Sequence, residues 1–306
     1  VKFGAKVIET ATFRQNSQTV GEIIEHASEG PFEDNTFGTP ETDAYRRDFT
    51  VNGLFYDIKD FSVIDWVGGM KDLKRGLIRA VGDPDIRFQE DPVRMMRAVK
   101  FSSRLGFKIE KKTAAAMKRH HACILNASVP RVCEEVFRLF PYGNSMTAFK
   151  LMWEYGMLGD LLPELASFIA KNGGDRCVLW KHLESLDAYE RMMAGKGFEV
   201  SNAVRAAVLM SGMYQAQGRE GAGRKVMQTM MDSLKIPKAV YFSAVLLLES
   251  GKRLSSAPAK GKSRFIYNRD FLDALDYNRI IARAEKRSED ALNAWADLYE
   301  EKGQNE

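Results

Sequence analysis

The chain has 306 residues, of which 45% are hydrophobic and 28% are charged, a composition typical of folded globular proteins. Its formal net charge of +4 is compatible with an anionic partner, and three cysteines without metal-ligand spacing argue against a disulfide framework. The first residues lack a signal-peptide pattern, and no apolar run approaches the ~20 residues of a membrane span. We therefore expect a cytoplasmic protein of two or three packed units that makes no membrane contact.

The first part of the chain predicts a small sheet. Residues 5–13, "AKVIETATF", are rich in valine, isoleucine and threonine and indicate a strand. Residues 15–43 lose this pattern and form a stretch that is long for a loop, so it is either mobile or functional. Strand-like runs at 49–57 and 61–66, joined by "IKD", predict a hairpin that "GGMKDLKRG" closes.

Helical periodicity dominates after about residue 86. The sequence "QEDPVRMMRAVKFSSRLGF" predicts a helix with Asp91 as its N-cap, Pro92 at its first position and Gly106 at its end. Further helices are expected at "TAAAMKRHHACIL", "SVPRVCEEVFRLF" and "MTAFKLMWEYGML", at 179–193, 202–216, 222–234 and 238–252, and as two final helices after "SSAPAKGKS". These patterns predict an α+β fold, in which an all-helical body follows a small sheet region.

The stretch "RRDFTVN" places charges directly in front of an apolar run. On a strand, side chains alternate between the two faces, so Arg46, Asp48, Thr50 and Asn52 would share one face. A buried face does not tolerate a cation, a carboxylate, a hydroxyl and an amide without partners, and a ribose with its triphosphate would provide them. The alternative is an edge strand whose charges are solvated.

The stretch "EDPVRMMR" forms the second polar cluster. Asp91, Arg94 and Arg97 follow one another in steps of three residues, so a helix would place them on one side of its first two turns. A carboxylate beside a guanidinium offers acceptors and donors that match the Watson–Crick edge of a base. The alternative is a capped helix with a charged solvent face.

Several motifs in series resemble one family. "IETATFR", "RRDFTVNGLFYD", "DWVGGMKDLKRGLIRAVGDPDIRFQEDPVRMMRAVKFSSRLGF" and "RVCEEVFRLF" are similar to successive motifs of the class II nucleotidyltransferases. This group contains the CCA-adding tRNA nucleotidyltransferases and the bacterial poly(A) polymerases. The resemblance is dense from residue 3 to about 140. It implies the C-terminal part of a nucleotidyltransferase head, or palm, at 1–78, a helical neck at 79–145 that carries the base-reading helix, and a helical RNA-binding body at 146–306.

The resemblance also assigns roles to positions of this sequence. The residues that would grip the ribose and support the incoming nucleotide are Arg46, Arg47, Asp48 and Asn52. Asp91 and Arg94 match the pair that reads the base by hydrogen bonding, with Arg97 beside them.

Three further segments match the family. Glu9 corresponds to the acidic position on the strand beside the metal-binding aspartates, and would be catalytic. "GGMKDLKRG" resembles a flexible connector, and "RVCEEVFR" resembles the helix that supports the base-reading helix. The spacings Arg131–Glu135 and Glu134–Arg138 would also suit ion pairs within one helix.

The implied chemistry is attack of an RNA 3′-hydroxyl on the α-phosphate of ATP, which releases pyrophosphate. Two Mg²⁺ (or Mn²⁺) ions would assist it, since these ions prefer carboxylate and phosphate oxygens. The family's Gly-Gly loop and Asp-x-Asp metal pair are missing from residues 1–45, and the chain begins with Val rather than Met. We therefore expect the metal ligands upstream of Val1, and no catalysis from this chain alone.

Branch-specific features favour a poly(A) polymerase. "NGLFYD", "DWVGGMKDL" and "EDPVRMMRAVKF" resemble that branch, whose partners would be ATP and the 3′ ends of mRNA or other transcripts, with no DNA expected. A CCA-adding enzyme, acting on tRNA with CTP and ATP, is the first alternative. A non-catalytic RNA- and nucleotide-binding module is the second.

Basic residues in the helical body offer candidate RNA contacts. They cluster at "GKRLSSAPAKGKSRF", and the candidates are Lys252, Arg253, Lys260, Lys262 and Arg264. Such a cluster could follow an RNA backbone through its phosphates. The alternative is a solvated loop.

Overall fold

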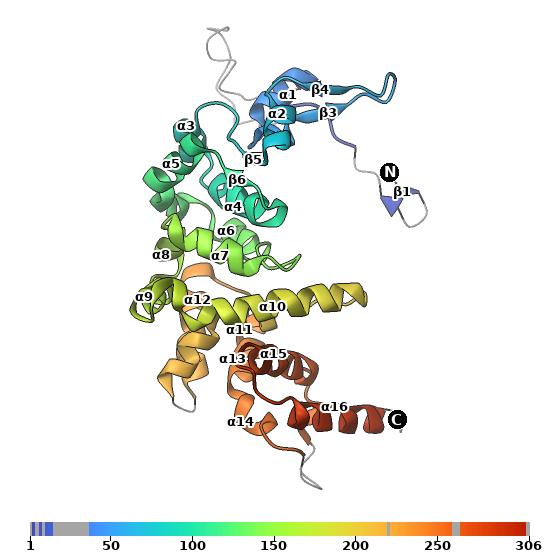
Figure 1. Ribbon diagram of the computed structural model, residues 1–306, viewed down its shortest axis with the longest axis vertical. Helices are drawn as coiled ribbons and strands as arrows, with labels where there is room; N and C mark the ends of the chain where they lie inside the picture. The colour runs from blue at the N-terminus through green and yellow to red at the C-terminus, as the bar shows by residue number, and fades with distance from the viewer. Residues whose placement is uncertain are drawn as a thin grey trace, which may run out of the picture.

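The computed structural model describes residues 2–3, 6–7, 10–14, 37–218, 221–258 and 264–303. Figure 1 shows the chain descending along the longest axis of the molecule, from a small α/β region at one end to the last helices at the other. Within these ranges, no helix combines the length and the apolar character that crossing a bilayer requires. The α+β fold with a helical body is confirmed.

The strands are short and form three separate pairs. The antiparallel pairs are β1 (Lys2–Phe3) with β2 (Lys6–Val7) and β3 (Leu54–Tyr56) with β4 (Val63–Asp65), and the parallel pair is β5 (Leu77–Ile78) with β6 (Lys108–Ile109). The predicted hairpin is therefore confirmed at β3–β4. Of the strand expected at 5–13, residues 6–7 form β2 and 10–13 carry no strand, while 5, 8 and 9 lie outside the described residues.

One strand prediction was wrong. The run expected as a strand over 49–57 is a strand only at 54–56, because residues 50–52 form the 3₁₀ helix η2 (Thr50–Asn52). Phe49 makes an isolated antiparallel bridge with Ala80. The preceding charged residues also leave the strand, since Arg46 ends the helix α1 (Pro40–Arg46). Asp48 and Asn52 still meet, but through a tight helical turn rather than through alternation along a strand.

Helices form the rest of the molecule. The helices of the neck and its surroundings are α2 (Gly69–Arg75), α3 (Pro84–Glu90), α4 (Val93–Leu105), α5 (Lys111–His120), η3 (His121–Asn126), α6 (Val129–Phe137) and α7 (Ser145–Glu154). Those of the body are α8 (Met157–Leu161), α9 (Pro163–Lys171), η4 (Gly174–Arg176), α10 (Val178–Gly195), α11 (Asn202–Gln217), α12 (Ala222–Leu234), α13 (Lys238–Glu249), α14 (Gly251–Leu254), η5 (Arg264–Tyr267), α15 (Phe271–Ala284) and α16 (Asp290–Gly303).

The helix predictions hold almost everywhere after residue 86. Gly106 ends α4 with a φ of 67°, a left-handed conformation that glycine adopts without strain. The helix expected over 238–252 divides into α13 and α14 at Ser250, while α3, α8 and α9 were not predicted. The segment "GGMKDLKRG", expected as a flexible connector, contains the helix α2.

The helix α4 lies at the centre of the neck. Val93, Met95, Met96 and Val99 are buried, whereas Leu105 at its end is exposed, and the helix packs against both α6 and α7. The apolar core continues from α4 into the body without interruption, through Phe140 and Phe149 to Phe271. Polar residues at the start of α4 are thus fixed to a rigid element, which favours a precisely shaped site.

The start of α2 touches the 3₁₀ turn so closely that only glycine fits. A Cβ on Gly69 would lie 2.2 Å from the carbonyl oxygen of Thr50. We expect Gly69→Ala to destabilise the fold by about 1–3 kcal/mol, because the backbone must move apart. Gly159→Ala is the control, since nothing lies within 4 Å of its Cβ, and it should be neutral or slightly stabilising. Thermal unfolding midpoints that are equal for both variants would refute this contact.

Candidate functional site

Asp43 holds both arginines of "RRDF" on the last turns of α1. Its Oδ1 accepts hydrogen bonds from Arg46 Nε at 2.7 Å and from the Arg14 backbone N–H at 3.2 Å, while Oδ2 accepts from Arg47 Nη2 at 2.6 Å. Burial raises the pKa of Asp43, but the hydrogen bonds from Arg47, Arg46 and Arg14 outweigh burial, so the net pKa falls below its ordinary value of 3.8.

This lowered pKa predicts a contribution to acid stability. A carboxyl whose folded pKa is depressed stabilises the fold above its unfolded pKa, and that contribution is lost as the pH falls through the folded pKa. For Asp43 the loss should begin below pH 3.8. We expect Asp43→Asn to lower the free energy of unfolding at neutral pH. The difference from the parent chain should become smaller in strong acid, and urea unfolding at several pH values would measure it. A constant deficit across that range would contradict the assignment.

Asp48 joins the 3₁₀ turn to α4. It is 9% exposed, and its Oδ1 accepts hydrogen bonds from the Phe49 backbone N–H and from Asn52 Nδ2, both at 2.9 Å. Its Oδ2 accepts from Arg97 Nε at 2.6 Å, across 49 positions of the sequence. The same Arg97 guanidinium lies 5.4 Å from the centre of the Phe101 ring. Three of the predicted residues, Asp48, Asn52 and Arg97, are thus brought together.

Thr50, expected on the same face as Asp48, has a different partner. Its hydroxyl donates to Asp72 Oδ2 at 2.8 Å, and Arg79 Nε donates to the same oxygen at 2.8 Å. Arg79 also lies 3.3 Å from Glu110. This buried network was not predicted, and it anchors α2 against the turn, so α2 is a fixed support in this structure.

Arg87 on α3 is a further residue that sequence reasoning missed. It is 7% exposed, and its Nη2 donates to the carbonyl oxygens of Arg46 at 2.7 Å and Arg47 at 3.0 Å. Its Nη1 donates to Glu90 at 3.0 Å, while its buried Nε has no acceptor among the described residues. The acid–base spacing in "RFQEDPVR" was the available signal, since Glu90 lies within helical reach of basic residues on both sides.

Arg94 lies beside Arg87 with an incompletely satisfied guanidinium. Its Nη1 is 3.5 Å from Glu90 Oε2, an ion pair without hydrogen-bond geometry, and this buried nitrogen has no acceptor among the described residues. Burial lowers the pKa of Arg94, and repulsion from Arg87 adds to that, although nearby Asp91, Glu90 and Asp48 oppose it. Buried unpaired donors are costly, so an acceptor from a ligand would stabilise this cluster.

Asp91 takes a different position from the one expected. α4 begins at Val93, and Asp91 Oδ1 accepts a long hydrogen bond, 3.3 Å, from the Val93 N–H. Its other oxygen accepts from Arg131 on α6 at 3.0 Å, so Arg131 does not pair with Glu135 as predicted. The Arg94 backbone N–H donates to the Asp91 carbonyl oxygen at 3.1 Å, while the two side chains interact only through their charges.

The helix α6 supports α4, as its resemblance implies. Lys100 of α4 donates to Glu135 at 2.6 Å, which adds a second ion pair to that between Arg131 and Asp91. The predicted pair of Glu134 with Arg138 is confirmed at 2.5 Å.

The remaining candidates lie elsewhere. Glu9, Lys260 and Lys262 fall outside the described residues. Lys252 and Arg253 lie on α14, and Arg264 opens η5. In Figure 1, α14 is at the opposite end of the molecule from α3 and α4. The structure therefore separates these residues from the Asp48 cluster, which comprises Asp48, Asn52, Arg87, Arg94 and Arg97.

The described residues do not fit a metal centre. They contain no group of three or more side chains that could hold an ion. The sequence has one Asp-x-Asp pair, but Asp83 caps α3 and Asp85 is held by Arg119 at 2.7 Å and His120 at 2.8 Å. The expected metal ligands therefore stay a prediction.

Two protein families match parts of this chain. Residues 1–79 match the family described as "Poly A polymerase head domain", and residues 106–169 match the family described as "Probable RNA and SrmB- binding site of polymerase A". The first match ends after η2, α2 and β5, and the second contains α6. All residues of α3 and α4 lie between the two matches.

Known proteins are similar to parts of this chain. Poly(A) polymerase I of Escherichia coli O6:H1 is 42% identical over 180 residues, which cover 56% of this chain and 38% of that protein. A CCA-adding enzyme of Lactobacillus helveticus is 41% identical over 126 residues, covering 41% of this chain and 31% of that protein. The chain thus spans well under half the length of these relatives.

A solved structure extends the similarity into the body. The Bacillus stearothermophilus CCA-adding enzyme in complex with CTP superposes with a TM-score of 0.63 at 25% identity, covering 88% of this chain and 60% of that chain. The sequence and structure matches together confirm the resemblance that the motifs indicated.

Proposed function

We propose, on the premise that the chain resembles the class II nucleotidyltransferases, that it forms the nucleotide-selecting and RNA-holding part of a template-independent RNA nucleotidyltransferase. The reaction would add AMP from ATP to RNA 3′ ends. The observation that carries this proposal is a pair of buried guanidinium nitrogens, Arg87 Nε and Arg94 Nη1, beside the bridge of Asp48 to Arg97. Neither nitrogen has an acceptor in the part of the chain that the structure describes. A nucleotide provides the acceptors that these donors lack.

Each residue of the cluster receives a role from its position. Arg94 would donate to an acceptor on the edge of the base, and Asp91 would accept from its amino group, with Arg131 holding the carboxylate in place. Arg97, oriented by Asp48, would face the sugar side of the base. Such preorganised charged hydrogen bonds are strong when water is excluded.

The ribose and triphosphate would lie toward α1 and the 3₁₀ turn. Asp48 and Asn52 would define the position of the sugar, because the hydrogen bond between them fixes both side chains. Arg46 and Arg47 extend from the buried Asp43 and are themselves partly exposed, so they could reach phosphate oxygens. Glu9 is proposed as a catalytic acidic residue from its motif alone.

In the proposed reaction, the 3′-hydroxyl oxygen of the RNA forms a bond to the α-phosphorus of ATP. The bond from that phosphorus to the bridging oxygen breaks, and pyrophosphate leaves while the hydroxyl proton passes to solvent or a base. The residues of this chain would select and align the nucleotide, since alignment of reactants supplies a large part of such rate enhancements.

A CCA-adding enzyme is the second candidate. It is favoured by the structural similarity to the Bacillus stearothermophilus enzyme over 88% of this chain. The poly(A) polymerase branch is preferred because the match to the Escherichia coli protein is longer, 180 against 126 residues, at nearly the same identity.

The test supplies two RNAs to the natural gene product and, in parallel, to the 306-residue chain. An oligo(A) primer and a tRNA lacking its terminal CCA are incubated with Mg²⁺ and with ATP, CTP or both. Long adenylate ladders without CTP incorporation are the expected result. Two cytidines followed by one adenosine on tRNA alone would assign the protein to the CCA-adding branch. The absence of any product from the gene product would favour a non-catalytic binding module.

A further inference from the structure

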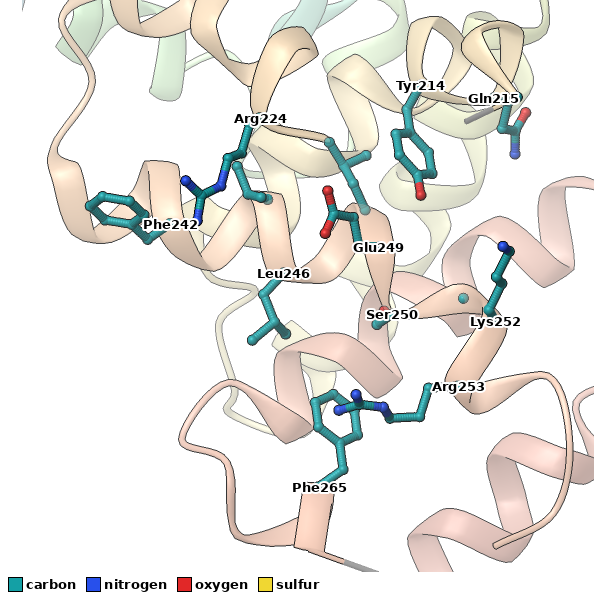
Figure 2. A pocket seen from close by; sticks show the side chains of 14 residues that line it. Tyr214, Gln215, Arg224, Phe242, Leu246, Glu249, Ser250, Lys252, Arg253 and Phe265 are labelled. Atoms are coloured by element: carbon teal, nitrogen blue, oxygen red, sulfur yellow. The ribbon is translucent and has the colours of Figure 1, made fainter. Parts of the chain in front are cut away.

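A cavity lies in the body, far from the Asp48 cluster. It has a volume of about 650 Å³ and is formed by α11, α12, α13 and α14 together with Phe265 of η5. This volume is within the range of small-molecule and nucleotide sites. Figure 2 shows polar and aromatic side chains entering it from different helices.

The rim of this cavity is basic. Arg224, Lys252 and Arg253 are exposed side chains that line it, against the single carboxylate of Glu249. The Arg253 guanidinium is held over the Phe265 ring, 4.7 Å from its centre, and Figure 2 shows the two in contact. A cation positioned by an aromatic ring keeps its hydrogen-bond donors available for an anion.

One oxygen of the Glu249 carboxylate accepts no hydrogen bond from the described residues. This oxygen, Oε1, is buried. In Figure 2 the carboxylate lies in the middle of the cavity, between Arg224 and Tyr214 in that view. Gly223 makes room for it, since a Cβ there would lie 2.9 Å from Oε1. An unpaired buried acceptor is costly, so an N–H group from a ligand would stabilise it.

An aromatic surface stands at the edge of the same cavity. Phe242 is 55% exposed, and Figure 2 shows it beside Arg224. Exposed aromatic rings next to arginines are the usual means of stacking an unpaired base. The cavity therefore combines cations for a phosphate, a ring for a base and a carboxylate for an amino group.

We propose that this cavity binds one nucleotide whose base carries an exocyclic amino group, with its phosphate at Arg224 and Arg253 and its amino group at Glu249. The nucleotide would be a residue of the single-stranded RNA, held away from the growing 3′ end. A free nucleotide has the same chemistry and is the other source. The inference of an RNA source rests on the proposed function.

The first test measures the binding of labelled oligo(A) and oligo(U) to the chain by fluorescence anisotropy at several salt concentrations. Arg224→Ala is expected to weaken oligo(A) binding about tenfold. It should also reduce the salt dependence by about 0.7 in slope, the effect of one phosphate contact on a single strand. Lys225→Ala is the control, since it removes an equal charge from the next residue, which does not line the cavity. It should change neither the affinity for oligo(A) nor the slope of the salt dependence.

Glu249 is tested through base preference. Glu249→Gln is expected to remove the preference for oligo(A) over oligo(U), because an amide can accept from adenine and also donate to uracil. Gly223→Ala should reproduce this loss while keeping the glutamate, since the added methyl group displaces the carboxylate. Circular dichroism of each variant verifies the fold. A retained preference in both variants would overturn the role of Glu249.

Titration with AMP separates the two sources. Weaker binding of both AMP and oligo(A) by Arg224→Ala and Glu249→Gln assigns an RNA residue to the cavity, and an effect on AMP alone assigns a free nucleotide. If both variants bind AMP and oligo(A) as tightly as the parent chain does, the proposed cavity site is overturned. The proposed function still stands in that case, provided that the parent chain binds oligo(A). If the parent chain does not bind oligo(A), the proposed function fails, and the AMP titrations still test the cavity.

Discussion

Arg94→Ala is expected to reduce kcat/KM for nucleotide addition by about tenfold to a hundredfold without lowering stability. A charge-assisted hydrogen bond contributes about 1.5–3 kcal/mol, and each 1.36 kcal/mol corresponds to a factor of ten in rate. The fold should not suffer, because Arg94 Nη1 is a buried donor with no acceptor among the residues that the structure describes, and burial and Arg87 both disfavour its positive charge. Primer extension and thermal unfolding of the gene product measure the two effects separately.

Two further variants sharpen this prediction. Arg94→Lys should not restore activity, because an ammonium group lacks the planar set of donors that matches the edge of a base. Arg104→Ala removes an arginine near the end of the same helix, where its guanidinium stacks on Tyr142, and should leave nucleotide selection unchanged. If Arg94→Ala loses stability and activity together, Arg94 supports the fold rather than the nucleotide.

Asp48→Ala is expected to lower both the stability of the fold and the rate of nucleotide addition. Its carboxylate accepts hydrogen bonds from Phe49, Asn52 and Arg97, so its loss leaves buried donors unpaired and separates the 3₁₀ turn from α4. We expect a loss of about 3 kcal/mol in the free energy of unfolding, together with loss of nucleotide addition.

A double-mutant cycle isolates the contribution of the bridge. Asp48→Ala, Arg97→Ala and the double variant are compared by chemical denaturation, and a coupling of about 1–3 kcal/mol is expected for residues in direct contact. Arg97 is one-third exposed, which places the value toward the lower end of that range. Additive effects of the two substitutions would show that the 2.6 Å contact is not energetically coupled.

The helical part of the fold could be predicted because its signals are local. A glycine in a left-handed conformation ends α4 at Gly106, and apolar residues recur at helical spacing on the buried faces of the body helices. The 3₁₀ turn at 50–52 could not be predicted in this way. It is stabilised by a hydrogen bond from Asn52 to the neighbouring Asp48 and by one from Thr50 to Asp72, which is 22 positions away. β-branched residues there suggested a strand that tertiary contacts override.

The candidate site could be predicted in most of its members but not in its pairings. Asp48, Asn52 and Arg97 were singled out by residue type, yet the contact between Asp48 and Arg97 spans 49 positions and follows no local spacing. The pairing of Asp91 with Arg131 likewise depends on how α6 packs against α4. Arg87 was missed because a single arginine in a helix is usually solvated, and only the fold shows it buried.

The measurement that tests the central claim most directly is hydrogen–deuterium exchange of the chain with and without ATP, compared with Arg94→Ala. Binding at the Asp48 cluster predicts slower exchange of backbone amides at 43–52 and 84–97 in the parent chain, and little change there in the variant. Protection confined to α11–α14, or equal protection at 84–97 in the two proteins, would contradict the claim that these residues select the incoming nucleotide.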